Sequence, residues 1–83
     1  MNEDESQFRT FDLALASALV ANGYTISAIE RTQYGGKSSF IFDRTSGLDQ
    51  VIQAYWADGL TVNPKAYFDV LKHIKTRIYS EAR

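Results

Sequence analysis

The sequence predicts a small α+β domain in which a β-hairpin packs on three helices, in the chain order α-β-β-α-α. Three observations lead to this prediction. Apolar residues recur with helical spacing in three segments of the chain. Between the first and second of these segments lie two short stretches in which apolar and polar residues alternate. The glycine pair Gly35-Gly36 separates the two alternating stretches. Because 83 residues can build only one hydrophobic core, we expect a single globular domain over residues 8–80.

The two ends of the chain are expected to lie outside this domain. Residues 1–7 hold Glu3, Asp4 and Glu5 and no apolar residue after Met1, which predicts a disordered acidic tail. At the other end, residues 81–83 are expected to fray.

The first helix is predicted over residues 11–21. Thr10 can accept hydrogen bonds from the free amides as N-cap, Asp12 suits the positive end of the helix dipole, and Asn22-Gly23 is a common stop signal. Because apolar side chains surround this helix almost completely, it should lie at the centre of the fold.

The hairpin is predicted from strands at residues 24–29 and 38–43. A three-residue loop, Tyr34-Gly35-Gly36, gathers most apolar side chains on one face, whereas a two-residue loop scatters them. In this register the core face consists of Tyr24, Ile26, Ala28, Phe40 and Phe42. Ile29 and Ile41 then lie opposite each other on the outer face, where they form a small apolar patch.

Two further helices complete the domain. In the second, Thr45 or Ser46 is the expected N-cap and Gly59 the expected end, with an apolar stripe of Leu48, Val51, Ile52 and Tyr55. The third begins at Asn63-Pro64, a cap followed by an N1 proline, and runs to about Ser80. Its apolar side is predicted to hold Tyr67, Phe68, Leu71, Ile74 and Ile78, and its polar side Lys65, Asp69, Lys72 and His73.

Composition and motifs argue against an enzyme. Without cysteine there is no disulfide, thiolate zinc site or thiol nucleophile. Gly35-Gly36-Lys37-Ser38 is not a phosphate loop, because Arg31 stands where the first glycine is needed and a strand follows instead of a helix. His73 has Asp69 and Arg77 one turn away on either side, which is typical of a solvated ion-pair ladder. We therefore expect no catalytic residue, no metal and no cofactor.

The favoured interpretation is a small non-catalytic interaction module in the cytoplasm, since no segment resembles a signal peptide or a membrane span. Its predicted partner is another protein or a second copy of this chain. A homodimer through the hairpin is favoured, because a two-stranded sheet leaves both of its edges unpaired. The candidate interaction residues are Ile29, Ile41, Tyr55 and Trp56. Trp56 itself is expected to pack partly against the third helix.

Two alternatives remain open. The first is a nucleic-acid-binding accessory protein, which the net charge of −1 does not favour, with candidate contacts Arg31, Tyr34, Lys37, Lys72, Lys75 and Arg77. The second is a small-ligand-binding protein with an aromatic pocket near Trp56.

Several short motifs together resemble a family of short bacterial and phage proteins that carry a domain of unknown function. These motifs are Phe8-Arg9-Thr10-Phe11-Asp12-Leu13-Ala14-Leu15-Ala16, Gly23-Tyr24, Phe40-Ile41-Phe42, Tyr55-Trp56 before Gly59, and Leu71-Lys72-x-x-Lys75-x-Arg77-Ile78-Tyr79. The resemblance spans about Phe8 to Ser80. It implies a compact αββαα domain, no catalytic residue, and a loose association with phage or mobile elements.

Overall fold

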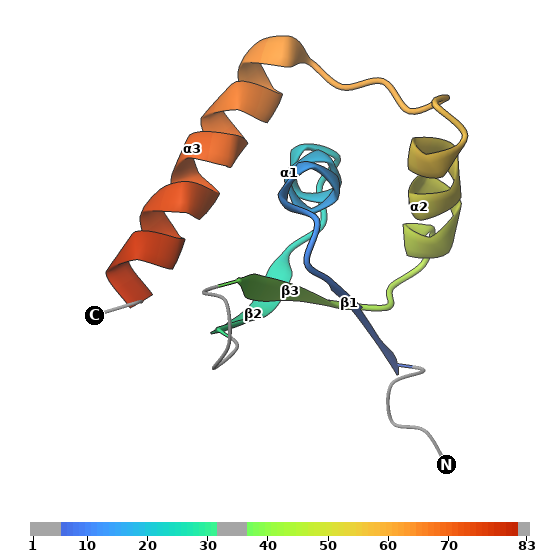
Figure 1. Ribbon diagram of the computed structural model, residues 1–83. Helices are drawn as coiled ribbons and strands as arrows, with labels where there is room; N and C mark the ends of the chain where they lie inside the picture. The colour runs from blue at the N-terminus through green and yellow to red at the C-terminus, as the bar shows by residue number, and fades with distance from the viewer. Residues whose placement is uncertain (1–5, 32–36, 82–83) are drawn as a thin grey trace.

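The computed structural model describes residues 6–31 and 37–81, which form three helices on one face of a three-stranded antiparallel sheet (Figure 1). The elements are β1 (Gln7–Thr10), α1 (Leu13–Ala21), β2 (Ile26–Arg31), β3 (Ser38–Asp43), α2 (Leu48–Trp56) and α3 (Pro64–Glu81). The α+β class is confirmed. The order is β-α-β-β-α-α, so the sheet has one strand more than the sequence predicted.

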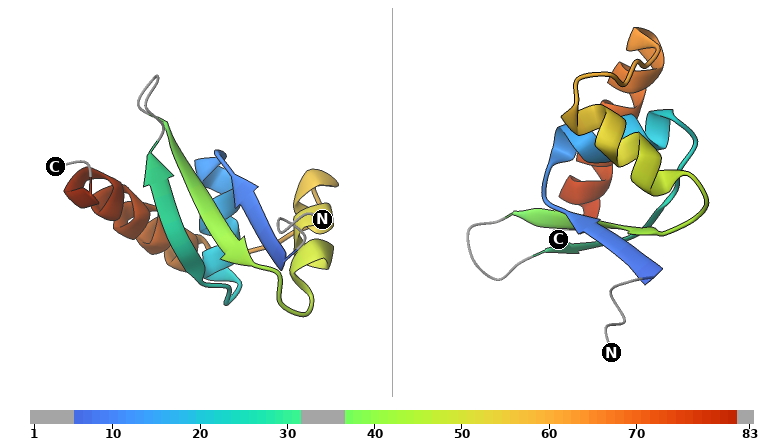
Figure 2. Two further views of the ribbon diagram at one scale, coloured as in Figure 1. Left: turned by 90° about the horizontal axis from the view of Figure 1, so that it is seen from below. Right: turned by 90° about the vertical axis from the view of Figure 1, so that its right-hand side faces the viewer.

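The additional strand is β1, which lies within the segment expected to be tail and domain entry. It pairs with β3, from Gln7 opposite Asp43 to Thr10 opposite Phe40, and the sheet order is β1-β3-β2 (Figure 2). Since Gln7 belongs to this strand, the predicted tail extended at least one residue too far. Residues 1–5, which include Glu3, Asp4 and Glu5, lie outside the described residues. Of the predicted frayed end, 81–83, Glu81 is the last residue of α3, and residues 82–83 lie outside the described residues.

The hairpin has a different register from the predicted one. Ile29 pairs with Phe40, not with Ile41, and the pairing shifts between Ile26 and Ala28, which marks a β-bulge at Ser27. The bulge adds one residue to the alternation, so that both Ile26 and Ile29 pack with the core. The predicted loop, Tyr34-Gly35-Gly36, lies outside the described residues.

The predicted patch of Ile29 and Ile41 is therefore wrong. Ile29 lies on the helix side of the sheet, while Ile41 lies on the opposite, helix-free face opposite Arg9 and Ala28. Ile41 is nevertheless only 4% exposed. On the same face the Arg9 guanidinium reaches across β3 to the Glu30 carboxylate at 2.7 Å, so this face presents polar groups to solvent.

Helix α1 begins two residues later than predicted, and its N-cap is Asp12. The Asp12 carboxylate accepts hydrogen bonds from the amides of Ala14 and Leu15. Thr10, the predicted cap, is the last residue of β1, and its hydroxyl accepts from the Asp12 amide at 3.0 Å. The cap was misplaced because the sequence does not show that a strand runs directly into the helix.

The predicted end and central position of α1 are confirmed. Gly23 has φ +101°, and the Tyr24 amide donates to the Leu19 carbonyl at 3.0 Å, which closes the helix in a Schellman-type turn. Helix α1 lies between α2 and α3 above the sheet (Figure 1). Its buried residues are Leu15, Ala16, Ser17, Ala18 and Leu19.

Both ends of α2 differ from the prediction. The N-cap is Gly47 with φ +87°, and no side chain caps the helix, so neither Thr45 nor Ser46 has the expected role. At the C-terminus Asp58, with φ +61°, takes the left-handed conformation that ends the helix, one residue before Gly59. The backbone turn at Gly47 therefore begins the helix without the predicted side-chain cap, and the turn at Asp58 ends it before the predicted glycine.

Helix α3 starts as predicted, with the Asn63 side chain accepting a hydrogen bond from the Ala66 amide at 2.9 Å. Its inner face contributes Val70, Ile74 and Ile78 to the core. Phe68 was predicted on that face and is instead 56% exposed, with the Lys72 ammonium over its ring. None of the helices in the described ranges is long and apolar enough to cross a membrane.

Ser17 provides a test of the packing around α1. Its side chain is fully buried and its hydroxyl makes no hydrogen bond within the described residues. Because an unpaired buried hydroxyl is destabilising, we expect Ser17→Ala to raise the free energy of unfolding by about 1 kcal/mol in urea denaturation. A lower free energy of unfolding would show that the hydroxyl has a partner, such as a buried water.

A groove between the sheet edge and helix α3

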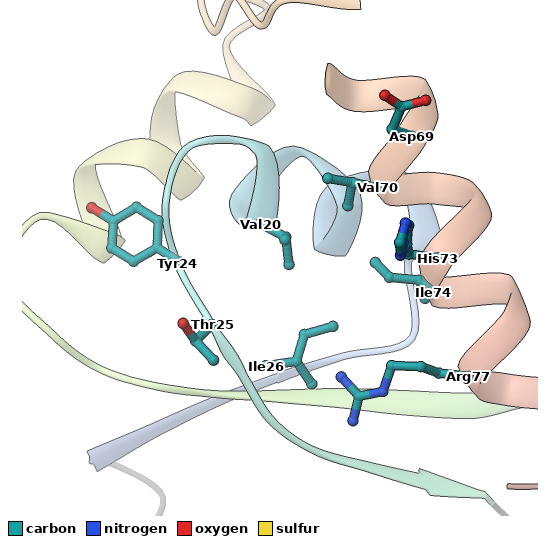
Figure 3. Close-up of a pocket in the computed structure, with 9 residues that line it drawn as sticks. All are labelled: Val20, Tyr24, Thr25, Ile26, Asp69, Val70, His73, Ile74 and Arg77. Carbon is teal, nitrogen blue, oxygen red and sulfur yellow. The ribbon is translucent and has the colours of Figure 1, made fainter. Parts of the chain in front are cut away.

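An apolar groove lies between the end of α1, the start of β2 and one side of α3 (Figure 3). Its volume is about 430 Å³. It is lined by Val20, Tyr24, Thr25, Ile26, Asp69, Val70, His73, Ile74 and Arg77. The α3 residues follow from helical geometry, because Asp69, His73 and Arg77 are spaced by four and share one side of the helix.

The floor of the groove belongs to the core. Ile74 and Ile26 are 3% and 9% exposed, and Val20 and Val70 pack against the same cluster. The floor is therefore supported from below by packed side chains and holds its shape without a ligand. A side chain placed on it would bury apolar surface against these four residues.

The rim of the groove carries the polar groups. Asp69 accepts a hydrogen bond from the Lys65 ammonium at 3.0 Å, and this bond together with the lysine charge lowers the pKa of the Asp69 carboxyl. His73 is exposed on the next turn. Arg77 extends from α3 toward the start of β2, beside Ile26 (Figure 3). The end of the groove next to the sheet therefore has a cation, and the far end has a carboxylate that Lys65 neutralises.

Tyr55 and Trp56, two predicted interaction residues, lie away from this groove. The Tyr55 hydroxyl donates to the Asp12 carboxylate at 3.3 Å, which ties α2 to the start of α1. Partial burial, and then the nearby Asp12 charge, raise the pKa of Tyr55, so the phenol keeps its proton. Trp56 is 63% exposed, with its ring at the edge of Tyr55. Helix α1 lies between α2 and α3 (Figure 1), and the predicted packing of Trp56 against α3 stays a prediction.

The residues predicted to contact nucleic acid do not converge on one face. Along α3, Lys75 and Arg77 are two positions apart, about 200° around the helix, so Arg77 lines the groove and Lys75 points away from it. Lys72 covers the exposed ring of Phe68. Arg31 ends β2 and Lys37 precedes β3, while Tyr34 lies outside the described residues.

The polar groups of the groove do not form a metal site in the described chain. Asp69 and His73 are one turn apart, but the described residues include no group of three or more His, Cys, Asp or Glu side chains placed to hold a metal ion. Two ligands on one helix face are fewer than stable metal sites in proteins use.

Comparison with known proteins identifies the family. A family model described as a domain of unknown function, DUF5659, matches residues 5–80, which is most of the chain. The chain belongs to DUF5659. No curated protein and no solved structure gives a match. The DUF5659 match spans β1 to α3, so the groove is built entirely from residues of the family domain.

Sequence reasoning found the parts of this DUF5659 groove but not the groove itself. Asp69, His73 and Arg77 stood out as a ladder with a spacing of four, which was interpreted as a solvated face of α3. Val20 and Thr25 carried no signal, since their role depends on how α3 packs beside β2. The signal that could have indicated the groove is the position of Asp69, His73 and Arg77 beside the apolar Val70 and Ile74. It places these three residues at the boundary between the polar and apolar sides of the helix.

Proposed function

We propose that this domain is a non-catalytic interaction module that binds an extended segment of a partner protein along the edge of β2. The observation that carries the proposal is the apolar groove beside an edge strand. An extended segment added to a sheet edge gains backbone hydrogen bonds from the strand, and alternate side chains enter pockets next to it. Both elements of this recognition mode are adjacent here.

The edge of β2 supports strand addition. Its pairing with β3 is regular from Ala28 to Arg31, and within the described residues no strand pairs with its other side. Edge strands direct alternate N–H and C=O groups outward, and short strands, prolines or bulges usually protect them. The bulge at Ser27 lies at the beginning of β2 and leaves the following residues in regular geometry, whereas the opposite edge strand, β1, has only four residues.

The chemistry of the rim supports binding without catalysis. In the described chain His73 makes no hydrogen bond or ion pair. The Asp69 carboxylate bonds to Lys65, not to His73. A general base is normally oriented by a hydrogen-bonded partner next to a nucleophile, and the groove has no such pair.

Selection from a random dodecapeptide display library on the full chain tests the proposal. We expect selected peptides to bind wild type and to lose about tenfold or more of their affinity on His73→Trp, which fills the groove from an exposed rim position. The matched control is Lys75→Trp, the same substitution on the opposite side of α3, which should leave the affinity unchanged. Binding should also slow amide hydrogen exchange in β2.

Two outcomes would overturn this proposal. Peptides whose affinity is the same on both tryptophan variants bind elsewhere, and a library that yields no binder removes the peptide-binding function. A second copy is the alternative occupant of the β2 edge, in keeping with the homodimer predicted from the sequence. If wild type sediments as a dimer that His73→Trp dissociates, the groove is a self-association surface.

A further inference from the structure

We infer that the outer side of α3 binds single-stranded nucleic acid, with bases stacked on Phe68 and Tyr79 and phosphates bound by Lys72 and Lys75. This surface lies on the side of α3 away from the groove, so the inference goes beyond the proposed function and does not depend on it. It follows from four exposed side chains that helical spacing brings together.

The four side chains form a single stripe along α3. Phe68, Lys72, Lys75 and Tyr79 are separated by four, three and four residues, which keeps them within about 60° of one another around the helix. All four are exposed. Helix α3 lies at the outside of the helix layer, with α1 on its inner side (Figure 1). The aromatic–lysine stripe therefore faces solvent over about 16 Å of the helix axis.

The two rings of the stripe offer surfaces for stacking. Phe68 and Tyr79 are 56% and 71% exposed, although both are large aromatic residues on the longest helix. An exposed ring presents a π-face on which any of the bases can stack, and this is the usual contact of proteins that bind single strands without reading their sequence.

The two lysines of the stripe are available to phosphates. Neither Lys72 nor Lys75 forms an ion pair in the described part of the chain. The Lys72 ammonium lies 4.9 Å from the centroid of the Phe68 ring, a cation–π contact that uses none of its N–H donors. Because an exposed contact of this kind is weak, a stacking base can displace the ammonium toward its own phosphate.

The charge around the stripe is positive, although the whole chain has a net charge of −1. Asp69 lies next to Lys72 on the groove side of the helix, where its carboxylate bonds to the Lys65 ammonium at 3.0 Å. Three lysines, at positions 65, 72 and 75, thus stand against one aspartate, which leaves a local excess of two positive charges. Such an excess attracts phosphates over a short range and is sensitive to salt.

Single-stranded nucleic acid fits this surface better than other polyanions. A duplex stacks its bases inside, so the two rings would have no role on it. An acidic peptide carries carboxylates but no series of flat rings. An anionic membrane binds helices through a broad apolar face, whereas the apolar face of α3 is packed in the core.

Fluorescence anisotropy of labelled oligonucleotides with the full chain tests the inference. We expect twelve-nucleotide oligo-dT and oligo-U to bind alike at about 50 mM salt, with a Kd of about 10⁻⁴ M, because bases and phosphates are common to both. An abasic twelve-mer, which keeps the phosphates, should bind about tenfold more weakly. The plot of log affinity against log salt should have a slope of about −1.4, as for two phosphate contacts.

Substitutions assign these effects to the stripe. Phe68→Leu and Tyr79→Ala should each weaken binding about tenfold, whereas Tyr79→Phe keeps the ring and should bind like wild type. Lys75→Gln should reduce the steepness of the salt dependence by about 0.7. Arg44→Gln is the matched control, since it removes the same charge beside Phe8 of β1, at the sheet edge far from α3, and should change nothing.

The contrary outcomes are equally definite. An abasic twelve-mer or a twelve-residue polyglutamate that binds as tightly as oligo-dT reduces the surface to its charge and overturns the inference. Equal losses on Lys75→Gln and Arg44→Gln overturn it as well. Binding to phosphatidylserine vesicles without binding to either oligonucleotide makes the partner a membrane. None of these results affects the peptide-binding groove, which the peptide selection and His73→Trp test separately.

Discussion

Phe42→Ala should lower the free energy of unfolding by about 3–5 kcal/mol, as a large-to-small change in a closed core does. Phe42 is 0% exposed in the central strand, where it pairs with Phe8 of β1 on one side and Ile26 of β2 on the other. Its truncation removes contacts from three strands at once. Because small domains have only about 5–15 kcal/mol of stability, the loss should be visible as a large decrease in the urea midpoint.

Phe68→Ala is the matched control for this prediction. Phe68 is the same residue type on α3, but it is 56% exposed and the Lys72 ammonium lies over its ring. Its truncation should change the free energy of unfolding by about 0.5 kcal/mol or less. Similar losses for the two variants would mean that the core is not centred on β3.

The second large effect is expected for Gly47→Ala, with a loss of about 1–3 kcal/mol. Gly47 has φ +87°, a left-handed conformation that alanine adopts only at a cost. A Cβ built there would lie 2.9 Å from the Tyr24 hydroxyl, so the start of α2 or the tyrosine must also move. Thermal unfolding followed by far-UV circular dichroism measures the loss.

Two companion variants separate these causes. Gly59→Ala is the control, because its nearest contact would be an ordinary 3.8 Å from the Ala54 carbonyl and its φ is not positive, so stability should stay level or rise slightly. Tyr24→Phe combined with Gly47→Ala removes the hydroxyl and should recover part of the loss. A Gly47→Ala protein as stable as wild type would mean that the turn before α2 tolerates a side chain.

Local signals predicted those parts of the fold that depend on neighbouring residues. Asn63-Pro64 and Asn22-Gly23 fix helix ends through hydrogen bonds within a few residues, and both were found where predicted. Strand β1 depends on a partner far along the chain, since Gln7 pairs with Asp43. The alternation in Gln7-Phe8-Arg9-Thr10 was too short to indicate a strand beside an acidic segment.

The groove could not be predicted for a related reason. It requires that α3 lie along the β2 side of the sheet, and neither helix periodicity nor the charge of Arg77 determines that position. Tyr55 and Trp56 were chosen as a pair of neighbouring aromatic side chains, and Trp56, for which partial packing was predicted, is 63% exposed. For Ile29 the register was off by one, which moved it to the wrong face of the sheet.

The bulge at Ser27 constrains how the length of this part of the chain can vary. Upstream, α1 ends in the turn at Gly23, and downstream β2 must present Ile29 and Arg31 to the helix side. Losing one residue from the strand would convert the bulged segment to plain alternation and exchange Ile29 with Ala28 or Glu30 at the core. An insertion or deletion between Gly23 and Arg31 therefore exchanges the side chains of β2 that face the core with those that face away from it. An insertion or deletion in the connection between α2 and α3 changes no strand in this way.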